Sequence, residues 1–167
     1  MGQRSVAARL VVALIALVAV FVSCAGPSPA MTPAPMSLRD YDTATTEIEA
    51  KLTRAMNQLG PLISSPAYAD PAWQGRLSSA GAALVTTYQE ARSTTPPICF
   101  RDTHPRLLVS LELFALGGKA LVNGIGQAGG DADRMYPTLE AASTALNTAT
   151  TSYRAVAQEM NDRQCTS

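Results

Sequence analysis

The sequence predicts an all-α fold, an antiparallel up-down-up-down four-helix bundle that follows a signal peptide and a Pro-rich tether. Three observations favour this fold. Apolar residues recur at helical spacing in four segments, helix-starting and helix-stopping residues separate those segments, and the connections are short enough to join antiparallel neighbours. The expected organisation is a signal peptide over 1–23, a lipidated cysteine and tether over 24–37, and the bundle over 38–167.

The first helix of the bundle is expected over about 38–59. Ser37 and Asp40 have the spacing of a capping box, in which side chains satisfy the free N–H groups of the first turn. Gly60 and Pro61 are expected to stop the helix, because glycine costs backbone entropy there and proline lacks an N–H donor.

The other three helices have their own boundary residues. Asp70 followed by Pro71 is a typical start for the second helix, with an N-cap side chain and a proline at the first helical position. The third helix is strongly apolar but carries Gly117 and Gly118 at its centre, which indicates either close backbone packing or a kink. The fourth has the most regular stripe, and Pro137 is expected to open it or to kink its first turn.

The charge balance argues against nucleic acid as a partner. The chain has 13 basic and 13 acidic residues, and the basic ones are scattered rather than gathered into a stripe. A protein that follows a phosphate backbone needs a basic surface. Only 5% of the residues are aromatic, so the core must be built mainly from alanine and aliphatic residues, which suit closely packed helices.

The N-terminus has the three-part layout of a secretory signal. Arg4 and Arg9 precede an uncharged apolar run of 13 residues, Leu10 to Val22, and the small residue Ser23 follows. As a helix this run is about 20 Å long, shorter than the roughly 30 Å hydrocarbon core of a bilayer. A cleaved signal is therefore favoured over the alternative, an uncleaved membrane anchor.

The end of this signal resembles the lipobox of bacterial lipoproteins. Phe21, Val22 and Ser23 precede Cys24 in the order that the lipidation and cleavage machinery reads, although Phe21 stands where leucine is usual. The resemblance covers the leader only. It implies that Cys24 becomes the lipidated N-terminus, and two or three acyl chains give stable anchoring. It also implies a membrane location facing outside the cytoplasm, on the plasma membrane or, in a Gram-negative organism, in the periplasm or on the outer membrane.

A tether is expected between the anchor and the bundle. Residues 25–37 contain four prolines and no charged side chain, so they cannot bury much surface. Partly extended, this segment reaches about 40 Å. Removal of Arg4 and Arg9 leaves 11 basic and 13 acidic residues, so the anchor rather than a basic patch would hold the protein at the membrane.

The three cysteines fit this interpretation. If lipid occupies Cys24, then Cys99 and Cys165 remain as a pair in an oxidising compartment, where a disulfide persists. The bundle topology supports the pairing, because the connection that carries Cys99 and the C-terminus should meet at one end. The loops at 61–70 and 126–136 should lie at the other end and are candidates for contact with a partner. The alternatives are two free thiols or, less favoured, a metal site, since neither cysteine has a Cys or His at ligand spacing.

No catalytic motif emerges from the chain, and we expect no enzyme activity. Gly124, Gly126 and Gly129 match a dinucleotide fingerprint in spacing, but no strand precedes them, so a helix end and loop is the better interpretation. Asp131 and Asp133 could form a carboxylate pair for metal or acid/base chemistry, but they more simply stabilise the start of the fourth helix through its dipole. No catalytic, cofactor-binding or metal-binding residue is assigned.

The leading hypothesis is a lipid-anchored binding or interaction module at the bacterial cell envelope, with an envelope protein or a small molecule as its unidentified partner. The alternative is a haem- or metal-binding redox bundle that uses His104, the only histidine. Met160 would fall at the same end of the bundle and could supply a second axial ligand. His104 is otherwise expected to cap the third helix or to face solvent. The threonine-rich fourth helix has a polar face that is either solvated or part of a ligand groove.

Overall fold

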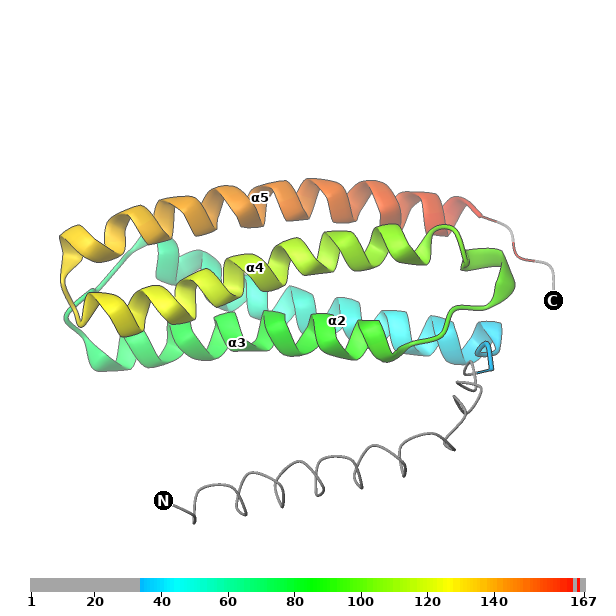
Figure 1. Cartoon of the computed structure of the whole chain (residues 1–167), viewed down its shortest axis with the longest axis horizontal. Helices are drawn as coiled ribbons and strands as arrows, with labels where there is room; N and C mark the ends of the chain where they lie inside the picture. The colour runs from blue at the N-terminus through cyan, green and yellow to red at the C-terminus, as the bar shows by residue number, and fades with distance from the viewer. Residues whose placement is uncertain (1–33, 164, 166–167) are drawn as a thin grey trace, which may run out of the picture. The chain divides into compact units, whose positions relative to one another are not determined.

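The computed structural model describes residues 34–163 and Cys165, and this part of the chain is a four-helix bundle without strands. Figure 1 shows the four helices side by side, each running opposite to the one before it. The predicted all-α, up-down-up-down architecture is therefore confirmed. The signal peptide, Cys24 and most of the tether lie outside the described residues. The elements are α2 (Leu38–Ser64), α3 (Pro71–Ser93), the short 3-10 helix η1 (Ile98–Phe100), α4 (His104–Ala128) and α5 (Ala132–Asp162).

The predicted end of the first helix at residue 59 was wrong, because α2 continues through Pro61 to Ser64. Proline removes one backbone hydrogen bond from a helix interior. Tertiary contacts offset this loss, since Leu62 and Ile63 pack against the core. The indole Nε1 of Trp73 also donates a hydrogen bond of 3.0 Å to the carbonyl oxygen of Leu62. The following helix thus stabilises a turn that local preference disfavours.

The helix starts follow the local signals in the sequence. The Ser37 hydroxyl accepts from the backbone N–H of Asp40 at 3.1 Å, and the Asp70 carboxylate accepts from the N–H of Ala72 at 2.8 Å. Asp131 caps α5 by accepting from the N–H of Asp133 at 2.9 Å. Helix α5 therefore begins before Pro137, which lies in its second turn rather than at its start.

The last turns of α4 contain the glycines of the apparent dinucleotide fingerprint. Gly124 and Gly126 lie within the helix, which ends at Ala128. Gly129 follows with φ of 57°, the left-handed conformation that ends many helices and that glycine adopts without strain. These glycines therefore form a helix C-terminus and its cap, as predicted.

Helices α3 and α4 approach each other through glycine. A Cβ atom at Gly81 would lie 2.8 Å from the carbonyl oxygen of Gly118, and a Cβ at Gly118 would meet the carbonyl oxygen of Gly81. Gly117 similarly faces Leu146 of α5, where an added Cβ would lie 3.0 Å from a side-chain methyl. Of the two possibilities left open for the Gly117-Gly118 pair, close backbone packing is the one that the contacts support.

The core joins all four helices and consists largely of leucine and alanine, as the composition indicated. Helix α4 is long and apolar enough to cross a membrane by length and composition, with a mean hydropathy of 1.4 in its most apolar stretch, but much of that stretch is buried inside the bundle. Helix α4 packs against both α3 and α5, so many of its apolar residues lie in the interior of the bundle. The buried aliphatic and aromatic core residues other than alanine are Tyr41, Ile48, Leu52, Leu59, Trp73, Leu77, Leu84, Leu107, Leu111, Phe114, Leu121, Met135, Leu139, Leu146 and Val156.

The ends of the bundle are arranged as the topology requires. The start of α2, the connection between α3 and α4, and the end of α5 lie at one end in Figure 1. There the structure brings Cys99 and Cys165 to disulfide distance, as predicted, with their Cα atoms 6.0 Å apart. The connections from α2 to α3 and from α4 to α5 lie at the opposite end.

Candidate functional site: a groove between the first and last helices

The seam between α2 and α5 is the least closely packed side of the bundle. The backbones of α2 and α3, α3 and α4, and α4 and α5 come close along their lengths, whereas α2 and α5 make few such approaches. These two helices are also the first and last of the described chain, so no connecting loop joins them. A groove can form there without breaking the core.

A groove of about 140 Å³ occupies this seam near the start of α2 and the end of α5. Its floor is apolar, with Ile48 and Leu107 buried and Met160 half-buried. Its rim is polar and exposed. The ten lining residues are Asp42, Thr45, Thr46, Ile48, Glu49, Leu107, Tyr153, Ala157, Met160 and Asn161. A pocket with an apolar floor and a few polar groups at the rim is typical of small-molecule sites.

The groove carries a negative formal charge. Asp42 and Glu49 are seven residues apart, so they lie on the same face of α2 and both line the groove. No lysine, arginine or histidine is among the ten lining residues. Within the described part of the chain, neither carboxylate takes part in an ion pair. Among the residues that the structure describes, the groove therefore presents two carboxylates without an ion-pair partner.

Tyr153 supplies an aromatic ring and a hydroxyl from the α5 side of the groove. Its ring is held by an edge-to-face contact with Phe114 of α4, with centroids 6.3 Å apart. Burial, and secondly the negative charge of Glu49, raise the pKa of Tyr153 to about 12. The hydroxyl therefore stays protonated at neutral pH. It has no hydrogen-bond partner among residues 34–163, so it is available as a donor or acceptor to a ligand.

A buried polar pair lies beside the groove. The Tyr41 hydroxyl of α2 and Nδ1 of His104 in α4 form a hydrogen bond of 2.9 Å, and the two residues are only 1% and 5% exposed. The prediction that His104 caps its helix or faces solvent was therefore wrong. Tyr41 reaches across from another helix and gives the ring a partner, and Phe100 stacks on Tyr41 with centroids 5.3 Å apart. Burial lowers the pKa of His104 and raises that of Tyr41 to about 12.

The geometry gives the haem or metal alternative no support. Nδ1 of His104 is engaged by Tyr41, and its ring lines no part of the groove to which Met160 contributes. Nε2 is buried without a partner in the described structure. In that same part of the chain, no group of three or more His, Cys, Asp or Glu side chains is placed to hold a metal ion. The arrangement makes His104 a core residue that joins α2 to α4.

Polar contacts hold the end of α5 next to the groove. Arg163 donates from its guanidinium to the carbonyl oxygen of Cys99 at 2.9 Å, and it pairs with Glu159 at 3.3 Å. Glu159 also forms an ion pair with Arg106 at the start of α4. Together with the Cys99 and Cys165 pair, these contacts join the last turn of α5 to the segment that precedes α4.

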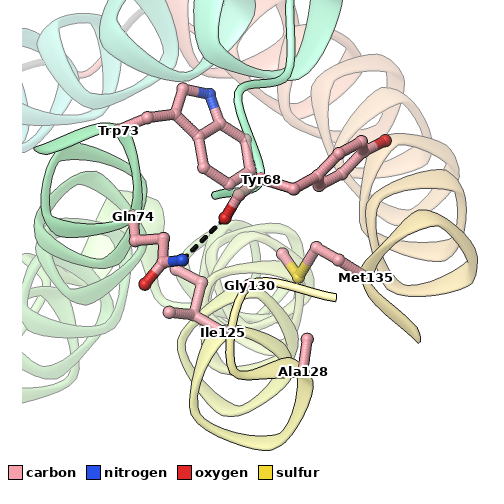
Figure 2. Close-up of a pocket in the computed structure, with 7 residues that line it drawn as sticks. All are labelled: Tyr68, Trp73, Gln74, Ile125, Ala128, Gly130 and Met135. Atoms are coloured by element: carbon pink, nitrogen blue, oxygen red, sulfur yellow. Dashed lines mark hydrogen bonds between the residues drawn. The ribbon is translucent and has the colours of Figure 1, made fainter. Parts of the chain in front are cut away.

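A small cavity lies at the opposite end of the bundle, where α2 is connected to α3 and α4 to α5. Figure 2 shows Tyr68, Trp73 and Met135 around a small cavity, where Nε2 of Gln74 donates to the carbonyl oxygen of Tyr68 at 2.6 Å. The cavity volume is about 10 Å³, which is at the lower limit for one water molecule. The cavity at this end therefore cannot hold a small organic ligand. The expectation that the loops at 61–70 and 126–136 contact a partner stays a prediction.

A wider hollow lies on the outside of α2 and α3, but it lacks a floor. Its volume is about 360 Å³, and five of its six lining residues are exposed while none is buried. Arg76 is its one charged lining residue. Small ligands bind best where most of their surface is covered. The α2–α5 groove, with its buried floor, is for this reason the better candidate; the residues of the hollow are Asn57, Gln58, Pro61, Leu62, Arg76 and Ser79.

The sequence indicated parts of this groove without showing that they meet. Ile48 and Met160 belong to apolar stripes that the periodicity indicates. Asp42 and Glu49 belong to no motif, and their seven-residue spacing, which puts them on one face of α2, is the only signal for them in the sequence. The threonine-rich face of α5 is solvated where Thr144, Thr148 and Thr151 are exposed and donate to carbonyl oxygens of their own helix.

No family model, curated protein or solved structure matched the chain.

Proposed function

We propose that the protein is a lipid-anchored binding module of the bacterial cell envelope and that the α2–α5 groove is its ligand site. The observation that carries the binding role is the groove itself, in which α2, α4 and α5 supply an apolar floor, a tyrosine hydroxyl and two carboxylates that have no ion-pair partner among the described residues. Such convergence costs packing in an otherwise close-packed bundle. A ligand site accounts for that cost.

The proposed membrane location depends on the N-terminal leader. The lipobox-like residues before Cys24 support lipidation, and the uncharged Pro-rich tether supports a bundle held a short distance from the lipid. Disulfide distance between Cys99 and Cys165 supports a bond formed in an oxidising compartment outside the cytoplasm. Because α2 begins where the tether ends, the groove would lie at the end of the bundle that the tether enters.

Binding rather than catalysis is proposed because of the groups that line the groove. They include no cysteine, histidine, lysine or serine, and the Thr45 hydroxyl donates to carbonyl oxygens of its own helix. Among the described residues, no imidazole or amine is hydrogen-bonded to Thr46 or Tyr153 to activate either hydroxyl. Asp42 and Glu49 are separated by about 10 Å along the helix axis, so they are poorly placed to act together on one bond. The groove is equipped to recognise a ligand.

Intact mass spectrometry of the membrane-extracted protein tests the proposed lipid anchor. We expect a chain that begins at Cys24 and carries acyl mass, with a gain of about 2 Da on reduction of one disulfide. Cys24→Ala should release the protein from the membrane or stall its processing. Unchanged membrane attachment of Cys24→Ala, with the leader intact, would show instead that residues 10–22 are a permanent anchor.

A pair of alanine variants tests the groove. Ala157 lines the groove, whereas Ala155 lies on the same helix and is exposed away from it. Fragment screening by saturation-transfer NMR on the full chain in neutral detergent should give binders that Ala157→Phe loses and Ala155→Phe keeps. If Ala157→Phe leaves the binding of these fragments unchanged, the binding site lies elsewhere and the proposal that the groove is the ligand site is wrong.

A further inference from the structure

We infer that the groove selects a small organic ammonium ion, whose charge pairs with Glu49 in the field of Asp42 and whose apolar body rests on the floor beside Tyr153. This inference rests on the proposed function, because it names the class of ligand for the same site. It goes further, since a binding groove could equally accept a neutral or an anionic molecule.

The charge of the groove selects a cation. Asp42 and Glu49 contribute two formal negative charges, with no basic residue among the lining side chains and no ion pair to either carboxylate within the described structure. A charge-assisted hydrogen bond from an ammonium group to a carboxylate is stronger than one between neutral groups. An anionic ligand would instead be repelled by both carboxylates.

The end of α5 adds to this preference. Met160 and Asn161 place the groove against the last turn of α5, where unpaired carbonyl groups give the helix its negative pole. That last turn contains no basic residue. Arg163, the residue that caps the helix, is engaged with Glu159 and with the carbonyl of Cys99. Two positive helix poles oppose this effect. The pole at the start of α2 is offset by Asp40 in its first turn. The pole at the start of α4, whose first turn contains Leu107 and no acidic residue, lies beside Glu159 of α5, which accepts from the Thr103 hydroxyl at 3.5 Å.

The floor of the groove sets the size of the ligand. Ile48, Leu107 and Met160 offer apolar surface, and Tyr153 adds an aromatic ring, which attracts cations through its π-electron density. The volume of about 140 Å³ is close to that of an engineered cavity of about 150 Å³ that holds benzene in another protein. The groove therefore suits a body of about one six-membered ring, with the ammonium group at the rim.

An inorganic cation fits the geometry less well. A calcium or magnesium ion needs several oxygen ligands at about 2.0–2.6 Å. Asp42 and Glu49 are two helical turns apart, about 10 Å along the axis, so they cannot both reach one ion. The described residues also offer no cluster of three acidic or imidazole ligands. An elongated ammonium ion can use one carboxylate directly and the field of the other.

Three probes with the same phenyl body and different charge test the inference. Binding of phenethylammonium, 2-phenylethanol and 3-phenylpropionate is measured by calorimetry on the full chain in neutral detergent. We expect phenethylammonium to bind at least about tenfold more tightly than 2-phenylethanol, and 3-phenylpropionate to show no binding. Glu49→Gln should lower the affinity for phenethylammonium about tenfold, and the affinity of the wild type for phenethylammonium should fall at high salt.

Matched variants separate this inference from the proposed function. Glu112→Gln removes an exposed carboxylate of α4 outside the groove and should leave binding unchanged. If Ala157→Phe abolishes binding of all three probes while Glu49→Gln changes none, the groove stands as the site and the selection for a cation is wrong. Failure of phenethylammonium to bind the wild type also overturns the selection. If binding is indifferent to Ala157→Phe, the proposed function fails as well.

Discussion

Two seams of one bundle show opposite solutions to helix packing. Between α3 and α4, Gly81 and Gly118 bring the two backbones into contact, with no space for even a Cβ atom. Between α2 and α5, residues such as Tyr153 and Glu49 line a groove of about 140 Å³. The first seam contributes stability through close packing. The second leaves polar and apolar groups accessible, which a binding site requires.

The difference between the seams follows from the size and polarity of the residues at each one. Glycine permits close approach and thereby excludes both water and ligands from the α3–α4 contact. Charged side chains at the α2–α5 seam must remain near solvent, because burying an unpaired carboxylate is costly. Perturbing each seam should therefore give effects of different size.

The largest expected effect comes from the predicted disulfide between Cys99 and Cys165, at the end of the bundle where α2 begins. Replacing both Cys99 and Cys165 by alanine should lower the free energy of unfolding by about 4 kcal/mol, given a sequence separation of 66 residues. Chemical denaturation measures the loss. Hydrogen exchange should accelerate first in the last turns of α5 and least at the α3–α4 contact. A loss below about 1 kcal/mol would mean that the polar contacts of Arg163 and Glu159 suffice to hold this end.

The closed seam should be the more sensitive to added volume. Gly118→Ala places a methyl group against the carbonyl oxygen of Gly81, and we expect a loss of about 2–3 kcal/mol because backbone atoms must move. Gly126→Ala is the matched control on the same helix, with nothing within 4 Å of its added Cβ. It should gain about 0.5–1 kcal/mol from helix propensity. Equal effects of the two substitutions would contradict the close approach of α3 and α4.

The buried pair beside the groove should make stability depend on pH. Burial lowers the pKa of His104 below its usual value of 6.5, so the unfolded chain takes up the proton first as the pH falls. The contribution of neutral His104 is complete about one pH unit above the unfolded pKa of 6.5, and the free energy of unfolding should fall as the pH drops from about 7.5 to 5. His104→Asn keeps an amide that can bond to Tyr41 but does not titrate. Its unfolding should show a flatter profile, and an unchanged profile would contradict the assignment.

The smallest effect is expected where the groove already provides space. Ala157→Leu should change the free energy of unfolding by no more than about 0.5 kcal/mol, because its added atoms enter the open groove. Ala142→Leu on the same helix inserts the same atoms at a position that is 1% exposed and should cost about 1–3 kcal/mol. Comparable losses in thermal or chemical denaturation would show that the groove is closed in solution.

Local signals in the sequence were sufficient for the helices and their order. Hydrophobic periodicity and N-cap residues such as Asp70 and Ser37 act within a few residues, so they can be read without knowing the neighbours. The bundle topology then predicted that Cys99 and Cys165 share one end, which the structure bears out at disulfide distance. The lipobox-like leader remains a prediction from sequence, since it lies outside the described residues.

Side-chain burial, hydrogen bonds and the groove between helices were decided only by the tertiary structure. Pro61 remains helical because Trp73 binds the turn that contains Leu62, and His104 is buried because Tyr41 of another helix provides a hydrogen bond. The groove likewise depends on side chains from α2, α4 and α5 that are more than a hundred residues apart at the extremes. The sequence by itself determined four amphipathic helices, because helix formation depends on neighbours along the chain. Burial, pKa shifts and the shape of the groove depend on contacts between helices, which no local pattern encodes.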